Sequence, residues 1–384
     1  MSLIILFFSY PAILGQYCQI PSGNHKLSLV SRTTEKLPTE KVITGFTIVG
    51  NEAFLSIAKT EEWRGNGSTD YPFIIEGYII NVDSGEEERG FEIASTDLFF
   101  IFRNNVVLGQ ADNSSGSLVD LVSVKNGIIA NNTIRFGHPG MYLSSVSNVV
   151  IENNLVERTY LGNGIDVFGG NNITIKGNTI RDNTQSGIGL TFGSRDVLIT
   201  DNECYRNGEA GVDLKRVVQD NLVSNNTLYG NKWGVEFLMA NANTVVDNLI
   251  HNNSLDGVWI FDKAEGSLIS GNVISNNSRG LHLKDAADLN ITNNRVEWNL
   301  KEGLMLNDTK NVRVEGNVFQ GNNKDQEYQI LDLGIGSVFS QNTITDTLVT
   351  SLTDLDETST NVSGYDFFVV LVGVLVALAR KKGI

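Results

Sequence analysis

The chain carries a pattern of apolar and polar positions that repeats about every 23 residues. A glycine followed by an apolar, a variable and an apolar residue recurs at spacings of 24, 23, 24, 23, 23, 23 and 23, at Gly140, Gly164, Gly187, Gly211, Gly234, Gly257, Gly280 and Gly303. The apolar residues after each glycine alternate with period two, as in Ile165 and Val167. That alternation predicts a β-strand with one buried face in every repeat.

Two further apolar columns run through the same repeats. The second column comprises Ile151, Ile175, Ile199, Val223, Val246, Ile269, Ile291 and Val314. The third comprises Val156, Ile180, Cys204, Leu228, Ile250, Ile274, Val296, Phe319 and Ile344. Three short strands per repeat follow, and each unit buries its apolar face only against its neighbours, so the units must stack. Cys204, in an inward slot, is predicted to be a small core residue.

Asparagine recurs at two fixed phases of the repeat. One column contains Asn132, Asn154, Asn178, Asn202, Asn226, Asn248, Asn272, Asn294, Asn317 and Asn342. The other contains Asn183, Asn207, Asn231, Asn253, Asn277, Asn299 and Asn322. Asparagine tolerates the left-handed backbone of tight turns, and stacked copies can bond from one coil to the next. Both columns are therefore predicted to be structural ladders.

These patterns predict an all-β fold, a right-handed parallel β-helix of about eleven coils with three strands per coil. We place the β-helix at residues 70–345, because degenerate coils can be traced back to Phe73. Residues 16–69 form the predicted N-terminal cap region. It includes a short helix from Asn51 to Trp63, with Asn51 as its N-cap and with Phe54, Leu55, Ile57 and Ala58 on one face.

Both chain ends are apolar and are judged as targeting segments. Residues 1–15 resemble the hydrophobic core of an export signal, and a buried N-terminal strand is the alternative. Residues 346–364 are rich in Ser, Thr and Asp and are predicted to be a linker. The tail, residues 365–384, joins a 13-residue apolar run to Arg380, Lys381 and Lys382. This predicts a C-terminal hydrophobic helix that anchors the protein on the outer face of the cell membrane.

Composition narrows the choice of partners. The formal net charge of −15 opposes binding to nucleic acid, which needs clustered Lys and Arg. The two cysteines and four histidines include no Cys-x-x-Cys or His-x-x-x-His pair, and His251 and His282 fall at different phases of the repeat. A specific copper site is therefore disfavoured, because copper is held by clustered Cys, His or Met.

Candidate chemistry lies on the outward positions of the strand that follows the repeat glycine. The residue between the two inward ones is, repeat by repeat, Asp120, Tyr142, Asp166, Gly189, Asp213, Glu236, Trp259, His282, Met305 and Asp332. Two residues further on, the same face offers Lys215, and Arg216 begins the next turn. We take Asp166, Asp213, Lys215 and Glu236 as candidate catalytic residues. Tyr142, Arg216, Trp259 and His282 are the candidate substrate-binding residues.

Such a stripe suits a polysaccharide in two ways. Aromatic rings hold sugars, and two carboxylates two coils apart, about 9.6 Å between backbones at ~4.8 Å per coil, suit an inverting hydrolase. We expect Gly189 to leave room for the water between Asp166 and Asp213. Alternatively, Lys215 or Arg216 neutralises a uronate in a lyase or an epimerase. Outward positions are also polar simply because they are exposed to solvent, so non-catalytic binding and a purely structural role stay open.

The N-terminal region resembles a known family. The segment from Ile43 to Asn51, then Trp63-Arg64-Gly65-Asn66-Gly67-Ser68, then Tyr71-Pro72-Phe73-Ile74-Ile75-Glu76-Gly77, is similar to the entry segment of archaeal NosD-type right-handed β-helix proteins. The resemblance covers about residues 40–345 and implies the same fold. It implies less about function, because the family includes a periplasmic copper-loading accessory protein, carbohydrate-acting enzymes and many surface proteins.

The leading hypothesis is a cell-surface β-helix that binds glycans or other surface partners without catalysis. The alternatives are a polysaccharide lyase, epimerase or hydrolase, and a metal accessory protein that handles copper. The chain lacks the Asp-Pro-His motif of the epimerases and the paired-Asp motifs of pectin-hydrolysing β-helices. No cofactor is expected, although the acidic run Glu86-Glu87-Glu88 could collect calcium. Asn361, in the predicted linker, is a candidate glycosylation site.

Overall fold

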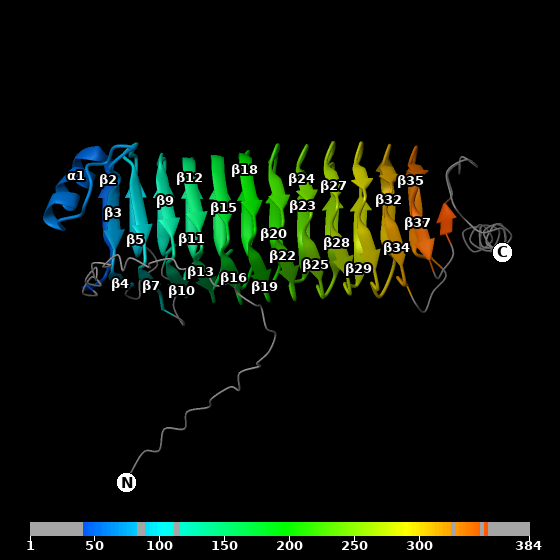
Figure 1. Ribbon diagram of the computed structural model, residues 1–384, viewed down its shortest axis with the longest axis horizontal. Helices are drawn as coiled ribbons and strands as arrows, with labels where there is room; N and C mark the ends of the chain where they lie inside the picture. The colour runs from blue at the N-terminus through cyan, green and yellow to red at the C-terminus, as the bar shows by residue number, and fades with distance from the viewer. Residues whose placement is uncertain (1–40, 83–88, 111–115, 324–327, 346–348, 352–384) are drawn as a thin grey trace, which may run out of the picture. The chain divides into compact units, whose positions relative to one another are not determined.

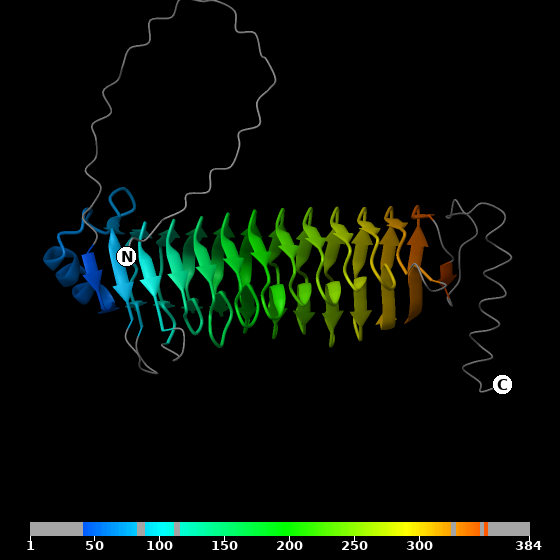
Figure 2. The ribbon, with the colours of Figure 1, turned by 90° about the horizontal axis from the view of Figure 1, so that it is seen from below.

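The computed structural model describes residues 41–82, 89–110, 116–323, 328–345 and 349–351. They form an all-β, right-handed parallel solenoid, as the sequence predicts. The coils stack along one axis (Figure 1), and the strands of successive coils lie side by side when the stack is turned (Figure 2). Each coil contributes one strand to each of three sheets, here called A, B and C.

Sheet A contains the third apolar column. Its thirteen strands within the described residues are β1 (Lys41–Ile43), β4 (Tyr78–Asn81), β7 (Val106–Leu108), β10 (Thr133–Arg135), β13 (Leu155–Glu157), β16 (Thr179–Arg181), β19 (Glu203–Tyr205), β22 (Thr227–Tyr229), β25 (Leu249–His251), β28 (Val273–Ser275), β31 (Arg295–Glu297), β34 (Val318–Gln320) and β37 (Thr343–Thr345). The column from Val156 to Phe319 is fully buried, Cys204 included.

Sheet B contains the strands that follow the repeat glycine. Over the same described ranges its thirteen strands are β2 (Phe46–Val49), β5 (Phe91–Ala94), β8 (Val119–Val122), β11 (Met141–Ser144), β14 (Ile165–Phe168), β17 (Ile188–Thr191), β20 (Ala210–Lys215), β23 (Trp233–Leu238), β26 (Asp256–Phe261), β29 (Arg279–Lys284), β32 (Leu304–Lys310), β35 (Ile330–Ile335) and β38 (Val349–Ser351). The predicted inward pairs, such as Ile165 and Val167, are fully buried.

Sheet C contains the second apolar column. Its twelve strands in the described part of the chain are β3 (Phe73–Glu76), β6 (Phe100–Arg103), β9 (Gly127–Ala130), β12 (Ser147–Glu152), β15 (Asn171–Lys176), β18 (Arg195–Thr200), β21 (Leu222–Ser224), β24 (Thr244–Val246), β27 (Leu268–Ser270), β30 (Asn290–Thr292), β33 (Arg313–Glu315) and β36 (Val338–Ser340). Val246 was wrongly placed in this column. Val245 is the buried residue, and it pairs with Val223 because that repeat is one residue shorter than the average.

Both predicted asparagine ladders are present and buried. In the first, each side-chain Nδ2 donates to the Oδ1 of the next coil and to a backbone carbonyl of the preceding coil. Asn202, for example, donates to Asn226 Oδ1 at 3.0 Å and to the carbonyl of Ile175 at 2.8 Å. The second ladder repeats this pattern from Asn183 to Asn322. These bonds satisfy backbone groups at the corners, which strand pairing cannot reach.

The repeat glycines pack against the second ladder. A Cβ at Gly234 would lie 2.3 Å from Ile250 Cγ2 and 2.5 Å from the carbonyl oxygen of Gly257. No side chain fits there, because the interior is close-packed. The glycine column is therefore a packing requirement of the corner between sheets A and B.

Helix α1 (Gly50–Thr60) lies at the N-terminal end of the stack (Figure 1). Phe54 is fully buried, and its ring stacks on Phe73 with centroids 5.3 Å apart. The expected N-cap is wrong: Val49 holds that position, and the Asn51 side chain instead bonds Thr96 and Asp97 at 2.7 and 2.8 Å.

Other details of the ends differ from the expectation. Leu55, placed on the buried face of the helix, is 48% exposed. Strands β1 and β2 pair with β4 and β5, so strand stacking begins N-terminal to residue 70, where the 23-residue period is not yet visible. Strand β38 likewise lies in the range predicted to be linker.

Several predictions fall outside the described residues. They are the export segment 1–15, the tail 365–384, the acidic run 86–88 and the glycosylation candidate Asn361. Among the described residues, no helix has the length and apolar character needed to cross a membrane.

Candidate functional site

The predicted stripe is a continuous column on the outer face of sheet B. Strand register brings these residues side by side in the order Glu92, Asp120, Tyr142, Asp166, Gly189, Asp213, Glu236, Trp259, His282, Met305 and Leu331. The last predicted member is wrong. Asp332 pairs with the inward Leu306 and is buried, because a longer connection shifts the phase after Met305.

Three predicted residues meet in one ion cluster. Lys215, from β20, points its Nζ to Asp213 Oδ2 at 2.7 Å and to Glu236 Oε2, on β23, at 3.0 Å. Glu209, which the sequence analysis missed, lies 3.9 Å away. Asp213 and Glu236 are only 4% and 3% exposed. We call Glu209, Asp213, Lys215 and Glu236 the lysine cluster.

Burial governs the protonation of this cluster. Burial raises the pKa of Asp213 to about 8; the Lys215 ammonium opposes that rise, and the charge of Glu236 adds to it. Burial also raises the pKa of Glu236, again against the effect of Lys215. Burial lowers the pKa of Lys215, but the two carboxylates outweigh that and raise it. The lysine therefore stays charged, and Asp213 holds a proton near neutral pH.

Asp166 stands apart from the lysine cluster. Burial raises its pKa, against a hydrogen bond from Asn163. The expected space for a water beside Gly189 is filled, because a Cβ at Gly189 would lie 2.3 Å from Asn163 Nδ2 and 3.3 Å from Asp166 Oδ1. Gly189 makes room for the Asn163 amide, so the water-separated carboxylate pair of an inverting hydrolase is not supported.

An aromatic group flanks the lysine cluster on its C-terminal side. Trp259 lies in register with Glu236 and stacks on Phe261, with centroids 4.0 Å apart, and on Trp233 at 4.8 Å. His282 lies next in the column, 3.4 Å from Asp256 Oδ2 through its Nδ1. We call Trp233, Trp259 and Phe261 the tryptophan patch.

A second aromatic pair flanks the cluster on its N-terminal side. Phe168 and Phe192 lie with centroids 4.4 Å apart, and Phe192 is 46% exposed. Arg216 sits in the turn after β20, as predicted, with its guanidinium 4.9 Å from the Phe192 ring centroid. The lysine cluster thus lies between two apolar surfaces on one face.

Tyr142 belongs to a different part of the face. It lines an open cleft of about 580 Å³ together with Arg89, Gly116, Ser117, Asp120, His138 and Pro139. Asp120 is 1% exposed and is paired with Arg89 at 2.9 Å. Strand register places two strands, β14 and β17, between Tyr142 and Asp213, so they face different parts of a long ligand.

Sequence reasoning missed Trp233 because alternation resets at the repeat glycine. A Cβ on Gly234 would point into the interior, and Val235 points there too, so two inward positions follow each other. Counting back from Glu236 with period two therefore predicts that Trp233 points inward, although it stacks on Trp259 on the outer face. Asp256, which likewise precedes a repeat glycine, also lies on the outer face, since its Oδ2 is 3.4 Å from Nδ1 of His282 in the outer column. The rule could be inferred from the clash that any side chain would cause at that glycine.

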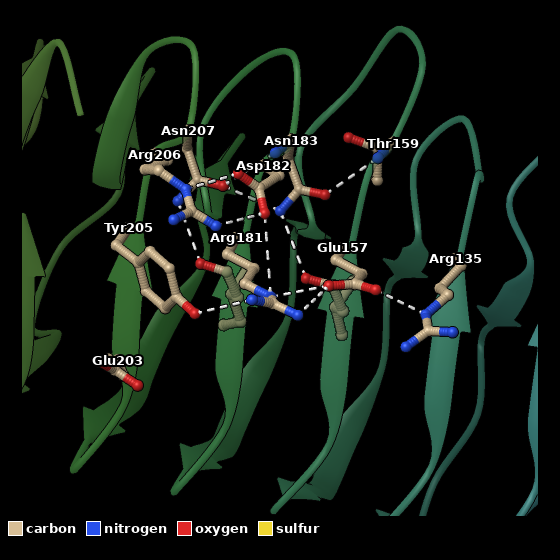
Figure 3. Close-up of polar contacts among 12 residues, drawn as sticks. Arg135, Glu157, Thr159, Arg181, Asp182, Asn183, Glu203, Tyr205, Arg206 and Asn207 are labelled. Carbon is tan, nitrogen blue, oxygen red and sulfur yellow. Dashed lines mark hydrogen bonds and ion pairs between the residues drawn. The ribbon is translucent and has the colours of Figure 1, made fainter. Parts of the chain in front are cut away.

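The outer face of sheet A is a contrasting surface (Figure 3). Glu157, 2% exposed, lies between Arg135 at 2.6 Å and Arg181 at 2.7 Å. Arg181 also donates to Tyr205 Oη at 3.1 Å. Beside them, Arg206 donates to Asp182 through Nε and Nη2, at 2.7 and 2.9 Å. These charges pair with one another from coil to coil, which indicates a stabilising role.

The histidines and Cys204 lie where the sequence places them. His251 lies on sheet A and His282 on sheet B, so they face different sides. Cys204 is fully buried in the core, and burial raises the pKa of its thiol. Within the described ranges, the one group of three possible metal ligands is Glu209, Asp213 and Glu236. Carboxylates do not fit copper, which prefers Cys, His or Met.

Two family models match the chain. Residues 117–266 match the right-handed β-helix region, and residues 205–350 match the periplasmic copper-binding protein NosD. A search of curated proteins finds no match.

Solved structures with the same architecture have low sequence identity. The A-module of the Azotobacter vinelandii mannuronan C-5 epimerase AlgE6 superposes with a TM-score of 0.63 at 16% identity, covering 77% of this chain and 90% of that one. The A-module of AlgE4, from the same organism, gives 0.59 at 16%, covering 78% and 94%. The Dettilon tailspike protein gives 0.57 at 11%, covering 76% and 63%.

The likeness to these solved structures establishes the fold alone. The family matches carry the classification further, because together they run from residue 117 to residue 350 of the three-sheet solenoid. The archaeal part of the resemblance stays a prediction. This chain is a NosD-type right-handed β-helix protein.

Proposed function

We propose that the outer face of sheet B binds a polysaccharide. The observation that carries this proposal is the lysine cluster lying between two aromatic surfaces on one continuous strand face. Sugar rings pack their apolar faces on aromatic side chains, and their hydroxyls bond charged groups beside them. The aromatic residues from Phe168 on β14 to Trp259 on β26 span four coil steps, about 19 Å at ~4.8 Å per step, which suits a short run of sugar rings.

The comparisons support a polysaccharide partner in a general way. The epimerases with this fold are named for mannuronan, a polysaccharide. The matched family model is described as periplasmic, which supports a location outside the cytoplasm. Anchoring by residues 365–384 is part of this proposal. Cell fractionation tests it: the full chain is expected in the membrane fraction, and a chain ending at residue 364 is expected to be released.

A binding assay tests the proposed function. The full chain is titrated with a panel of soluble neutral, amino and uronic polysaccharides, and the Trp259→Ala variant is compared with wild type. Loss of the ring is expected to weaken binding by up to about tenfold, since stacking aromatics contribute ~0.5–1.5 kcal/mol beyond their area. Trp298→Ala is the matched control, because Trp298 follows sheet A strand β31 and is 44% exposed. Equal affinity of all three proteins would contradict the proposal.

A second candidate is a polysaccharide-modifying enzyme, favoured by the raised pKa of Asp213. A carboxyl that keeps its proton near neutral pH can donate it to a leaving sugar oxygen. The same panel is then examined for chain cleavage or unsaturated products. Turnover that Asp213→Asn abolishes while binding remains would establish catalysis. If the wild type turned over none of the polymers, the enzyme candidate would be rejected and only the binding function would remain.

The copper accessory role finds no support in the described residues, whose one ligand group is carboxylate. Metal analysis after copper loading tests this alternative. Tight, stoichiometric binding of copper would support the accessory role.

A further inference from the structure

The charge of the sheet B face constrains the ligand. One ammonium, Lys215, is shared by Asp213 at 2.7 Å, Glu236 at 3.0 Å and Glu209 at 3.9 Å. Three carboxyl groups thus surround a single cation. An anionic sugar placed here meets acidic oxygens and finds the lysine already neutralised.

The sheet B face also carries buried carboxyl oxygens that have no hydrogen-bond partner or only the Lys215 ammonium. Asp213 Oδ1 and Asp166 Oδ1 are buried and have no hydrogen-bond partner, and Glu236 Oε2 has only its ion pair with Lys215. Asp213 holds a proton near neutral pH in the free chain, but an ammonium placed beside it favours the ionised form, which accepts hydrogen bonds and cannot donate them. Because an unmet buried acceptor is costly, these oxygens favour a ligand that brings donors.

Other cations of the face are also engaged. Arg89 pairs with Asp120 and Glu92, and Arg279 lies 3.3 Å from both Asp256 and Glu302. Lys232 and Arg216 lie over the rings of Trp233 and Phe192.

Lys284 is an exposed lysine at the same phase as Lys215, three coils further along. That separation, about 14 Å at ~4.8 Å per coil, places it outside the lysine cluster. The part of the face that carries the unmet oxygens is therefore acidic.

We propose that the ligand of this face is a glycan that carries free amino groups, and that polyuronates are poor ligands. This inference rests on the proposed glycan-binding function. Once the side chains that cover Asp213 Oδ1 and Glu236 Oε2 shift, a sugar ammonium donates to these oxygens through charge-assisted bonds, while the ring packs on the tryptophan patch. The ligand preference is thus opposite in charge to mannuronan, the polyuronate named for the structural neighbours.

Three oligosaccharides of equal length test this inference, namely oligomers of glucosamine, N-acetylglucosamine and galacturonate. Their affinities for the full chain are measured by calorimetry near neutral pH. The amino oligomer is expected to bind about tenfold tighter than its acetylated counterpart, as one charge-assisted bond predicts, and the galacturonate weakest. Galacturonate binding as tight as the amino oligomer overturns the inference and leaves the proposed function standing. Failure of all three to bind overturns both.

Variants separate charge from shape. Glu236→Gln keeps the side-chain volume and removes a charge, so the preference for the amino over the acetylated oligomer should fall about tenfold while affinity for the acetylated one changes little. Glu297→Gln, on sheet A, is the matched control and should keep the full preference. Asp213→Asn serves as a second variant if Glu236→Gln unfolds. An unchanged preference in a folded site variant overturns the inference.

Discussion

At the scale of single residues, Asp213 combines burial with charge in an unusual way. It is 4% exposed, it touches Lys215, and one of its oxygens has no hydrogen-bond partner. Such a residue does little for folding, because an ionised carboxyl in this position must give up its water. Groups that lower stability in this way are common at functional sites, where the surrounding fold holds them in place.

The Asp213 pKa predicts a pH-dependent stability. The carboxyl titrates near 8 in the folded chain and near 3.8 when unfolded, so between those values the folded state binds more protons. Its contribution to the free energy of unfolding is full below pH about 4 and falls as pH rises towards about 8. Asp213→Asn should flatten this dependence, as measured by thermal unfolding across that range. A variant with the wild-type slope would contradict the raised pKa.

Residue-scale chemistry was only partly predictable from sequence. Asp213, Lys215 and Glu236 were placed together because strand phase and the repeat are visible along the chain. Glu209 and Trp233 were not, since both precede the repeat glycine where alternation resets. Asn163 escaped for a similar reason: only the packed structure shows its amide filling the space beside Gly189.

At the scale of elements, the strands are too short to be stable alone. Most sheet A strands have three residues, so their corners depend on side chains for hydrogen bonds. The asparagine ladders provide these bonds. Asn226 accepts from the backbone N–H and side chain of Asn202, and donates to the carbonyl of Ile199.

Removing one ladder side chain should therefore be costly. Asn226→Ala leaves several buried groups unmet, and we expect the free energy of unfolding to fall by about 3 kcal/mol. Asn342→Ala, at the C-terminal end of the same ladder, should cost about 1 kcal/mol, since water can replace part of what is lost there. Chemical denaturation of both variants provides the measurement. Similar losses at the two positions would contradict the buried-ladder explanation.

Element positions followed from sequence wherever the period holds. The third apolar column, from Val156 to Phe319, was predicted correctly, because each repeat faces the same packing demand. The period is hidden in the first coils, where large rings such as Phe91 and Phe102 fill the core together, stacked at 4.0 Å. Bulky residues that pack across coils no longer need identical spacing, so β1 and β2 were taken for part of the cap region.

At the scale of the whole solenoid, each coil contacts only its neighbours, and stability is a sum of local terms. The N-terminal end is closed by α1, whose Phe54 packs on Phe73 and Phe100. A destabilising substitution in this region should therefore lower the stability only of the coils near the N-terminal end.

Phe54→Ala tests this locality. The cavity should cost about 3–5 kcal/mol of local stability and speed hydrogen exchange in β2 and β5. Exchange in β20 and β26, many coils away, should not change. Leu55→Ala is the control, because Leu55 is exposed. Faster exchange throughout the solenoid would contradict a locally additive structure.

The first asparagine ladder also gives the solenoid a direction. One N–H of each Nδ2 donates towards the C-terminal end, from the bond between Asn105 and Asn132 to the bond between Asn317 and Asn342, so the amide dipoles add head to tail as they do in an α-helix. Their acceptor pole, at the N-terminal end, is occupied by the backbone N–H of Tyr78. The ladder therefore has an acceptor end and a donor end. Two solenoids meeting end to end would continue the row of amide hydrogen bonds only if the donor end of one met the acceptor end of the other. The ladder thus gives the solenoid an electric dipole along its axis.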